Sequence, residues 1–236
     1  MKTPIIRSKE DVVRNVDEIG FLPFFKNHIE GFSLEEIVEP EFWYDSFGDG
    51  KLKWQAWSWR EEIALDKSAI YGKFFCGKAG FIAKEYFPDF CNYRRQGYDY
   101  DALYDEGFMK RSDKEIVDYL SRSGPILTSQ MKKELGFGKD GKKGFDSIIT
   151  RLQMQTYIGV TEFRYKVASK TRETYGWGVA VLDTAENCWG KELWSIIILR
   201  AHQRSRWPPF QRKPLRHVPL TVGWWKGCPP CSGQSG

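Results

Sequence analysis

Histidine and cysteine are scarce in this chain, and their spacing limits the chemistry that it can perform. The 236 residues include only three histidines (His28, His202 and His217) and five cysteines. An odd number of cysteines without the spacing of a disulfide framework predicts reduced thiols. The segment 228–231 reads Cys-Pro-Pro-Cys, the spacing of half a zinc site, but no second pair accompanies it. We therefore expect no metal site.

Long apolar runs and glycine-rich phosphate loops are also missing. No stretch approaches the roughly 20 apolar residues that a helix needs to cross a membrane. The first ten residues lack the apolar core of a signal peptide, so a cytoplasmic location is expected. No glycine-rich loop follows a predicted strand, where dinucleotides and nucleoside triphosphates bind. The sequence thus predicts no membrane partner and no small-molecule cofactor.

Residues 112–182 carry the pattern of a winged helix-turn-helix, a DNA-binding fold. Apolar residues at helical spacing follow Ser112, which can serve as an N-cap, and Gly124 ends this first helix. Two further helices precede two stretches rich in β-branched and aromatic residues, which a polar turn joins into a hairpin. The fold class expected is α+β. The later elements are predicted as helices over 129–135 and 145–152 and strands over 156–167 and 174–182, with a shared core of Ile116, Leu120, Met131, Leu135, Ile148, Ile149, Leu152 and Val179.

Charge is distributed unevenly, and the winged-helix segment is the most basic part of a chain whose formal net charge is +5. Residues 1–110 contain 15 basic and 20 acidic side chains, whereas residues 111–172 contain 13 and 7. Basic side chains on a third helix and a wing suit phosphate contacts, so double-stranded DNA is the expected partner. A solvated surface or a protein-binding module is the alternative. The expected contact residues are Lys139, Lys142, Lys143 and Arg151 around the third helix and Lys170 and Arg172 in the wing.

The N-terminal region, residues 1–110, is rich in aromatic residues and is expected to pack on the winged helix as an α/β region. Four tryptophans between positions 43 and 59 are more typical of a core than of base stacking. Between positions 71 and 97, lysines alternate with apolar residues, and an arginine pair follows. Two interpretations stay open: these cations follow a phosphate backbone, or they form ion pairs with neighbouring acids. The cations concerned are Lys73, Lys78, Arg94 and Arg95.

The last 36 residues, 201–236, differ in composition from the rest. They contain six basic residues, six prolines and no acidic residue, without a helical or strand period. This composition indicates a basic, disordered tail or a segment translated in a wrong reading frame. The winged-helix domain is accordingly expected to span 111–195, and the folded part of the chain is expected to end near residues 195–200.

The end of the third predicted helix carries two glutamines, Gln153 and Gln155, separated by Met154. In an extended segment residues i and i+2 point to the same face, so both amides would converge on one water or one sugar. An amide can orient a water and offer its carbonyl dipole to a developing cation, although it is a poor general base. Such a site suits the loss of an alkylated base that is already cationic. The alternative is two glutamines that contact DNA or solvent.

The segment 151–160 (Arg-Leu-Gln-Met-Gln-Thr-Tyr-Ile-Gly-Val) resembles the glutamine–apolar–Asp/Gln motif of the AlkZ-type winged-helix DNA glycosylases. Residues 5–190 as a whole are similar to the small AlkZ-related proteins, which carry segments like the Tyr-Gly-Lys-Phe-Phe found here at 71–75. The glycosylases excise alkylated bases and unhook interstrand crosslinks. The resemblance implies that Gln153 and Gln155 place the nucleophilic water of a base-excision reaction.

The chain also departs from the larger glycosylases. It has about half their length, shows one winged helix where they have tandem copies, and has Gln155 where the more reactive Asp is found. Three functions are therefore considered. They are a DNA-repair glycosylase for alkylated bases or crosslinks, a DNA-binding regulator without activity, and a winged-helix module that binds proteins.

Overall fold

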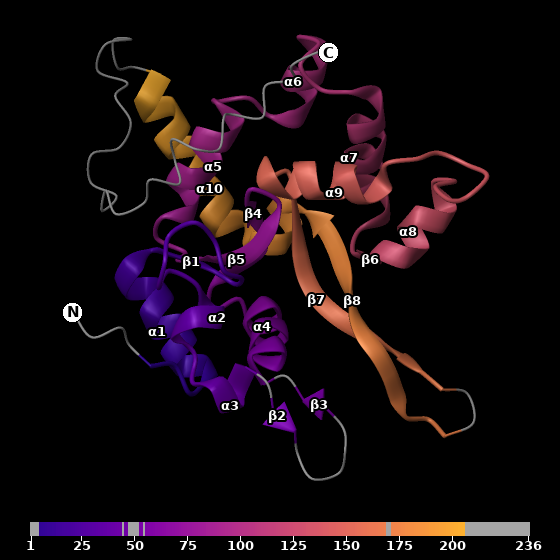
Figure 1. Ribbon diagram of the computed structural model, residues 1–236. Coiled ribbons are helices and arrows are strands. Elements are labelled where there is room, and N and C mark those ends of the chain that lie inside the picture. Colours follow the sequence, from indigo (N-terminus) through magenta and orange to yellow (C-terminus); the bar gives the residue numbers. More distant parts are fainter. Residues whose placement is uncertain (1–4, 44, 47–51, 54, 169–170, 206–236) are drawn as a thin grey trace.

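A computed structural model describes residues 5–43, 45–46, 52–53, 55–168 and 171–205 (Figure 1). The protein mixes helices with two three-stranded antiparallel sheets and one two-stranded ribbon. Across these ranges, no helix is both long and apolar enough to cross a membrane. The elements are α1 (Lys9–Ile19), β1 (Phe21–Pro23), α2 (Leu34–Ile37), α3 (Pro40–Trp43), β2 (Asp45–Ser46), β3 (Leu52–Lys53), α4 (Gln55–Asp66), β4 (Ile70–Phe75), β5 (Lys78–Ile82), α5 (Phe87–Arg95), α6 (Tyr100–Asp105), α7 (Arg111–Ser123), β6 (Ile126–Leu127), α8 (Thr128–Glu134), α9 (Phe145–Met154), β7 (Ile158–Val167), β8 (Thr174–Thr184) and α10 (Ala185–Ser205).

The first three-stranded sheet has the order β1-β5-β4. The chain enters it from α1, which Ser8 caps by accepting a hydrogen bond from the Asp11 amide (3.1 Å). Gly20 ends α1 with a φ of 85°, and a Cβ at this position would lie 2.9 Å from the ring of Tyr86. Both the backbone conformation and the close approach of the ring therefore require glycine. The turn leads directly into β1, all of whose residues are buried.

The second three-stranded sheet has the order β6-β8-β7 and follows the three helices α7, α8 and α9. β7 and β8 form a long hairpin, and β6 pairs only with the base of β8. Gly124 (φ 72°) ends α7, and Gly144 (φ 82°) precedes α9. The three helices and the hairpin predicted over 112–182 are present. Of the predicted core, Ile116, Leu120, Met131, Ile148, Ile149 and Leu152 are buried, whereas Leu135 and Val179 are half-buried.

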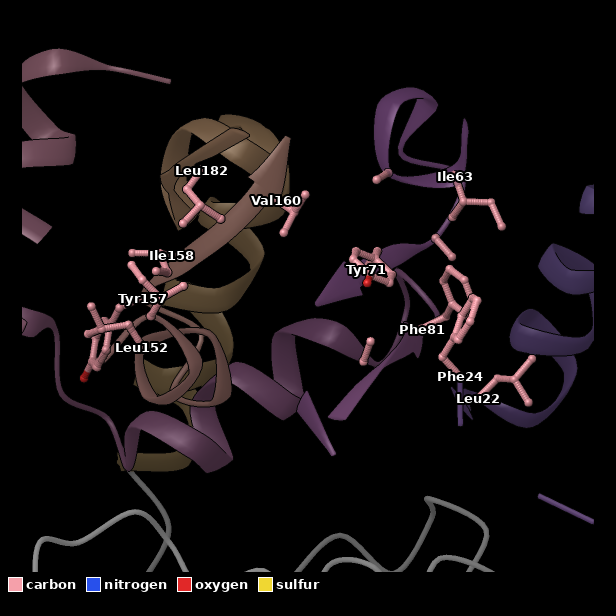
Figure 2. Close-up of a cluster of buried hydrophobic side chains, with 14 of the residues drawn as sticks. Leu22, Phe24, Ile63, Tyr71, Phe81, Leu152, Tyr157, Ile158, Val160 and Leu182 are labelled. Atoms are coloured by element: carbon pink, nitrogen blue, oxygen red, sulfur yellow. The ribbon is translucent and has the colours of Figure 1, made fainter. Parts of the chain in front are cut away.

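One hydrophobic core joins the two sheets. Figure 2 shows its labelled members in two groups, one around α9 and the base of the hairpin and one around the first sheet and α4. Tyr71 on β4 and Phe163 on β7 meet where the groups approach each other, with ring centroids 5.8 Å apart in an edge contact. The two regions are thus packed together through a shared core. The labelled residues are Leu152, Tyr157, Ile158, Val160 and Leu182 in the first group and Leu22, Phe24, Ile63, Tyr71 and Phe81 in the second.

Helix α10 continues to Ser205, past the end of the folded part expected near residues 195–200, with a kink at Gly190 (φ 82°). It packs on α5, where the Asn92 side chain donates a hydrogen bond to the carbonyl of Ile197 (3.0 Å). The side chain of Ile197 is buried in a second hydrophobic cluster with Phe87. The rest of the predicted tail, 206–236, lies outside the described residues.

Replacing Ile197 with alanine should lower the free energy of unfolding by about 2–5 kcal/mol, because a buried side chain is lost and its cavity closes only in part. The neighbouring Ile196→Ala is the matched control. Ile197 is 4% exposed and Ile196 is 36% exposed, so the control should cost less than about 1 kcal/mol. Urea unfolding followed by tryptophan fluorescence measures both. Equally small losses would contradict the packing of α10 on α5.

Candidate functional site

The two glutamines lie where α9 ends, in helical rather than extended backbone. Gln153 belongs to the last turn of α9, and Gln155 is its C-cap, with φ −82° and ψ −4°. Residues two apart on a helix point about 200° apart around its axis, so the expected convergence of both amides on one extended face is wrong. The strand begins only after Thr156, whose φ of 65° turns the chain. Each glutamine therefore has its own environment.

The amide of Gln153 is used within the fold. Its side chain is 4% exposed, and its Oε1 accepts a hydrogen bond from the backbone N–H of Lys73 (3.1 Å). The Lys73 ammonium in turn donates to Thr150 Oγ1 on α9 (3.3 Å). Because Lys73 lies on β4, an edge strand of the first sheet, Gln153 satisfies a backbone amide at a sheet edge. This pair of contacts fixes α9 to β4 and occupies the carbonyl that was expected to orient a water.

Gln155 differs from Gln153 in having an open acceptor. It is 9% exposed, and within the part of the chain that the structure describes its buried Oε1 accepts no hydrogen bond. A buried polar atom without a partner costs about 1–3 kcal/mol. Gln155 Oε1 is therefore the atom of the motif that remains open to a donor.

Arg95 holds the turn that follows Gln155. Its guanidinium donates to Thr156 Oγ1 (3.0 Å) and to the Thr156 carbonyl, and it lies 4.6 Å from the centre of the Tyr157 ring. Arg95 is only 6% exposed, so it supports the turn rather than presenting a cation at the surface. Burial raises the pKa of Tyr157 to about 12, although Arg95 lowers it, and burial raises the pKa of the Cys91 thiol to about 11. Both groups therefore remain protonated at neutral pH.

Three more of the predicted contact residues are bound within the fold. Arg151 forms a two-pronged ion pair with Asp113 of α7, with Nε–Oδ2 and Nη2–Oδ1 distances of 2.7 Å. Asp113 is 3% exposed, so the pair is shielded from water on one side. Lys78 donates to the carbonyl of Lys26 (3.1 Å), and Arg94 donates to a carbonyl of β4 (3.2 Å). These cations stabilise contacts between elements.

One group of exposed cations lies on α8 and on the segment between α8 and α9. Lys133 and Lys139 are exposed, and neither forms an ion pair with another described residue. Lys142 is exposed while pairing with Glu115, and Lys143 is exposed while donating to two carbonyls of its own loop. Sequence reasoning missed Lys133, although the basic last turn of α8 indicates it.

Helix α9 offers little of its own surface. Its exposed residues are Asp146 and Ser147, both in the first turn. Further along the helix, a Cβ built on Gly77 in the β4–β5 turn would lie 3.2 Å from Thr150, so this turn covers α9. The helix that was expected to contact DNA therefore exposes an acid in its first turn, and the first sheet covers part of its later half.

The far half of the β7–β8 hairpin carries further cations. Lys170 lies outside the described residues, and Arg172 is exposed beside the turn with a φ of 61°. Lys166, which sequence reasoning missed, is exposed and lies directly opposite Tyr175 in the strand register. The regular alternation of the strand is the signal that would have indicated it.

Groups that could hold a metal ion do not occur in the described ranges, where no three His, Cys, Asp or Glu side chains lie close enough together. A surface hollow beside α1 is lined mostly by charged side chains, and its two cations pair with acids. Lys9 binds Asp66 (2.8 Å), and Arg14 binds Asp11 (3.0 Å). Both cations of this hollow are therefore used within the fold.

The sequence model of one protein family, described as AlkZ related, matches residues 6–206. The chain belongs to the AlkZ-related family. No curated protein and no solved structure matches the chain. The region matched by the AlkZ-related model includes both glutamines and continues through α10. It therefore covers the contacts between α9 and β4 and those between α5 and α10.

Replacing Gln153 with alanine in this AlkZ-related protein should lower the free energy of unfolding by about 1–3 kcal/mol, because the Lys73 amide loses its acceptor. Gln130→Ala is the control, since the side chain of Gln130 bonds to Glu134 at the exposed surface of α8. The control should change stability by less than about 0.5 kcal/mol. Denaturant unfolding of the two variants provides the comparison. If Gln153→Ala costs no more than the control, the glutamine does not tie α9 to β4.

Proposed function

We propose that this AlkZ-related protein is a winged-helix protein that binds double-stranded DNA through contacts with phosphates. From α7 to β8 the chain runs helix, strand, helix, helix, strand, strand, and β8 lies between β6 and β7. A helix-turn-helix followed by a hairpin, with a short strand closing the sheet, is the arrangement of a winged helix. This element order is the observation that carries the proposal. The family match adds a relationship to DNA glycosylases.

The positions of the exposed cations indicate which elements would contact the DNA phosphates. Phosphates would meet the α8–α9 segment and the tip of the hairpin, because the expected contacts Arg95 and Arg151 are bound internally. In Figure 1 the α8–α9 segment and the hairpin both project away from the first sheet. Contacts to phosphates carry no base information, so binding should depend little on DNA sequence. The proposed contact residues are Lys133, Lys139, Lys142, Lys143, Lys166 and Arg172, with Lys170 as a further one.

Base excision is the second candidate function, and one observation favours it. The buried Oε1 of Gln155 has no partner among the described residues and would accept a hydrogen bond from a water or a sugar hydroxyl. The side chain is 9% exposed, so the site would have to open before a base reached it. Gln153 does not share this role, because its carbonyl binds Lys73. We therefore place DNA binding first.

Removing two surface charges with Lys133→Gln and Lys139→Gln should weaken binding to a fluorescently labelled duplex. The salt dependence should fall as well, with the slope of log affinity against log salt reduced by about 1–2, since each phosphate contact releases counterions. Lys26→Gln removes an exposed charge from the N-terminal region and serves as the control. Fluorescence anisotropy at several salt concentrations measures both quantities. A wild-type protein that binds no duplex at low salt would instead support the protein-binding module.

An alkylated duplex incubated with the purified protein should form no more abasic sites than the same duplex without protein, because neither glutamine reaches the surface. Cleavage of the treated DNA at abasic sites provides the measurement. Abasic sites that form with the wild type and with Gln130→Ala, but not with Gln155→Ala, would show base excision at Gln155. That result would replace the first proposal by the second.

A further inference from the structure

The far half of the hairpin exposes an unusual amount of aromatic surface. Among the described residues, eight large apolar side chains are exposed, and four of them lie on this hairpin. Tyr175 and Trp177 on β8 are 54% and 63% exposed, and Tyr165 and Val167 on β7 are 40% and 54% exposed. Single exposed apolar residues need no explanation, but a group of them marks a binding surface.

Among the described residues, α4 contacts the inner part of this hairpin half, and most of the hairpin half's surface is exposed. The last four residues of β7 and the first four of β8 are all exposed. These eight residues therefore lie at the surface, although α4 contacts two of them. β6 pairs only with Val181 and Leu182, so it does not extend the sheet to the tip. In Figure 1 this part of the hairpin projects beyond the helices.

Contacts within the fold account for only part of the aromatic surface. Tyr165 donates a hydrogen bond to Glu61 of α4 (2.6 Å), and its ring lies against Gly178, where a Cβ would be 3.3 Å from Tyr165 Cζ. Trp177 makes an edge contact with Trp57, with centroids 5.8 Å apart, and still exposes most of its surface. Tyr175 lies further out, opposite Lys166. Tyr175 and the exposed part of the Trp177 side chain therefore face solvent.

We propose that this ribbon, residues 164–167 and 172–177, binds unpaired bases of a nucleic-acid strand, which stack on Tyr175 and Trp177. Proteins bind single-stranded nucleic acids with aromatic side chains, on which the bases stack, and with neighbouring cations, which contact the phosphates. Lys166 and Tyr175 form a directly opposed cross-strand pair, so their side chains share a face. Arg172 adds an exposed cation beside the turn.

A protein partner fits this surface less well. The centres of protein interfaces are depleted in lysine, whereas here a lysine lies beside the outermost ring. A nucleic-acid strand with unpaired bases offers a phosphate to Lys166 and a base to the ring of Tyr175. The inference rests on the proposed function in one respect: the lysines of the α8–α9 segment would hold the adjoining duplex while the ribbon holds the unpaired bases.

Three labelled probes test the proposal by fluorescence anisotropy: a blunt duplex, the same duplex with a six-nucleotide single-stranded extension, and the single strand alone. The wild type should bind the extended duplex about tenfold more tightly than the blunt one, because stacking adds to phosphate contact. Tyr175→Ala should remove this difference without changing affinity for the blunt duplex. Tyr175→Phe should keep it, because the ring remains. Phe108→Ala, which removes an aromatic side chain that is 61% exposed elsewhere, is the matched control.

Trp177→Ala provides a second variant, although it also removes the contact with Trp57. The inference is overturned if the extension adds no affinity, or if Tyr175→Ala and Phe108→Ala behave alike. In either case binding of the blunt duplex would still support the proposed function. Conversely, a protein that binds the single strand in a Tyr175-dependent way but no duplex would support the ribbon site and contradict the duplex proposal.

Discussion

A side-chain-to-backbone hydrogen bond, from the Lys73 amide to Gln153 Oε1, holds helix α9 against the edge of the first sheet. An edge strand has backbone groups that need partners, and a helix that supplies one is held in place by it. Lys73 strengthens the link by donating to Thr150 on the same helix. With α9 placed against β4, its long side cannot enter a groove. In this half of the described chain, exposed cations lie on α8, on the segment that follows it, and on the hairpin.

The hairpin is held at its middle and free at its far end. Arg60 of α4 lies between the rings of Trp57 and Phe163, 4.3 Å and 4.1 Å from their centres, and is 6% exposed. A guanidinium removed from water and placed over aromatic faces makes a strong contact. Its neighbour Glu61 binds both Arg60 (2.9 Å) and Tyr165. The same α4 residues thus fix the direction in which the exposed ribbon points.

The sequence predicted the helices and the hairpin of the second sheet because their signals are local. Gly124 and Gly144 lie where the backbone takes positive φ, and the apolar spacing of residues such as Ile116 and Leu120 gives the buried face. The partners of the polar residues were not predictable in this way. Gln153 binds a residue 80 positions earlier, and Arg151 binds one 38 positions earlier. Reasoning from charge alone therefore included Arg95 and Arg151 among the surface cations, although both form contacts inside the fold. The glutamine motif likewise gave no sign that Gln153 Oε1 accepts a hydrogen bond from the Lys73 amide.

The two-stranded ribbon beyond the reach of β6 has another consequence, which concerns neighbouring molecules of the same protein. Both of its outer edges present backbone N–H and C=O groups, and such edges can pair with a strand from another chain. Charged residues on an edge strand oppose this pairing, because two copies would bring like charges together. Arg164 and Lys166 lie on the outer strand of this ribbon. These charges therefore oppose the joining of this projecting, aromatic hairpin to its copies in an extended sheet, although Arg164 also pairs with Glu162.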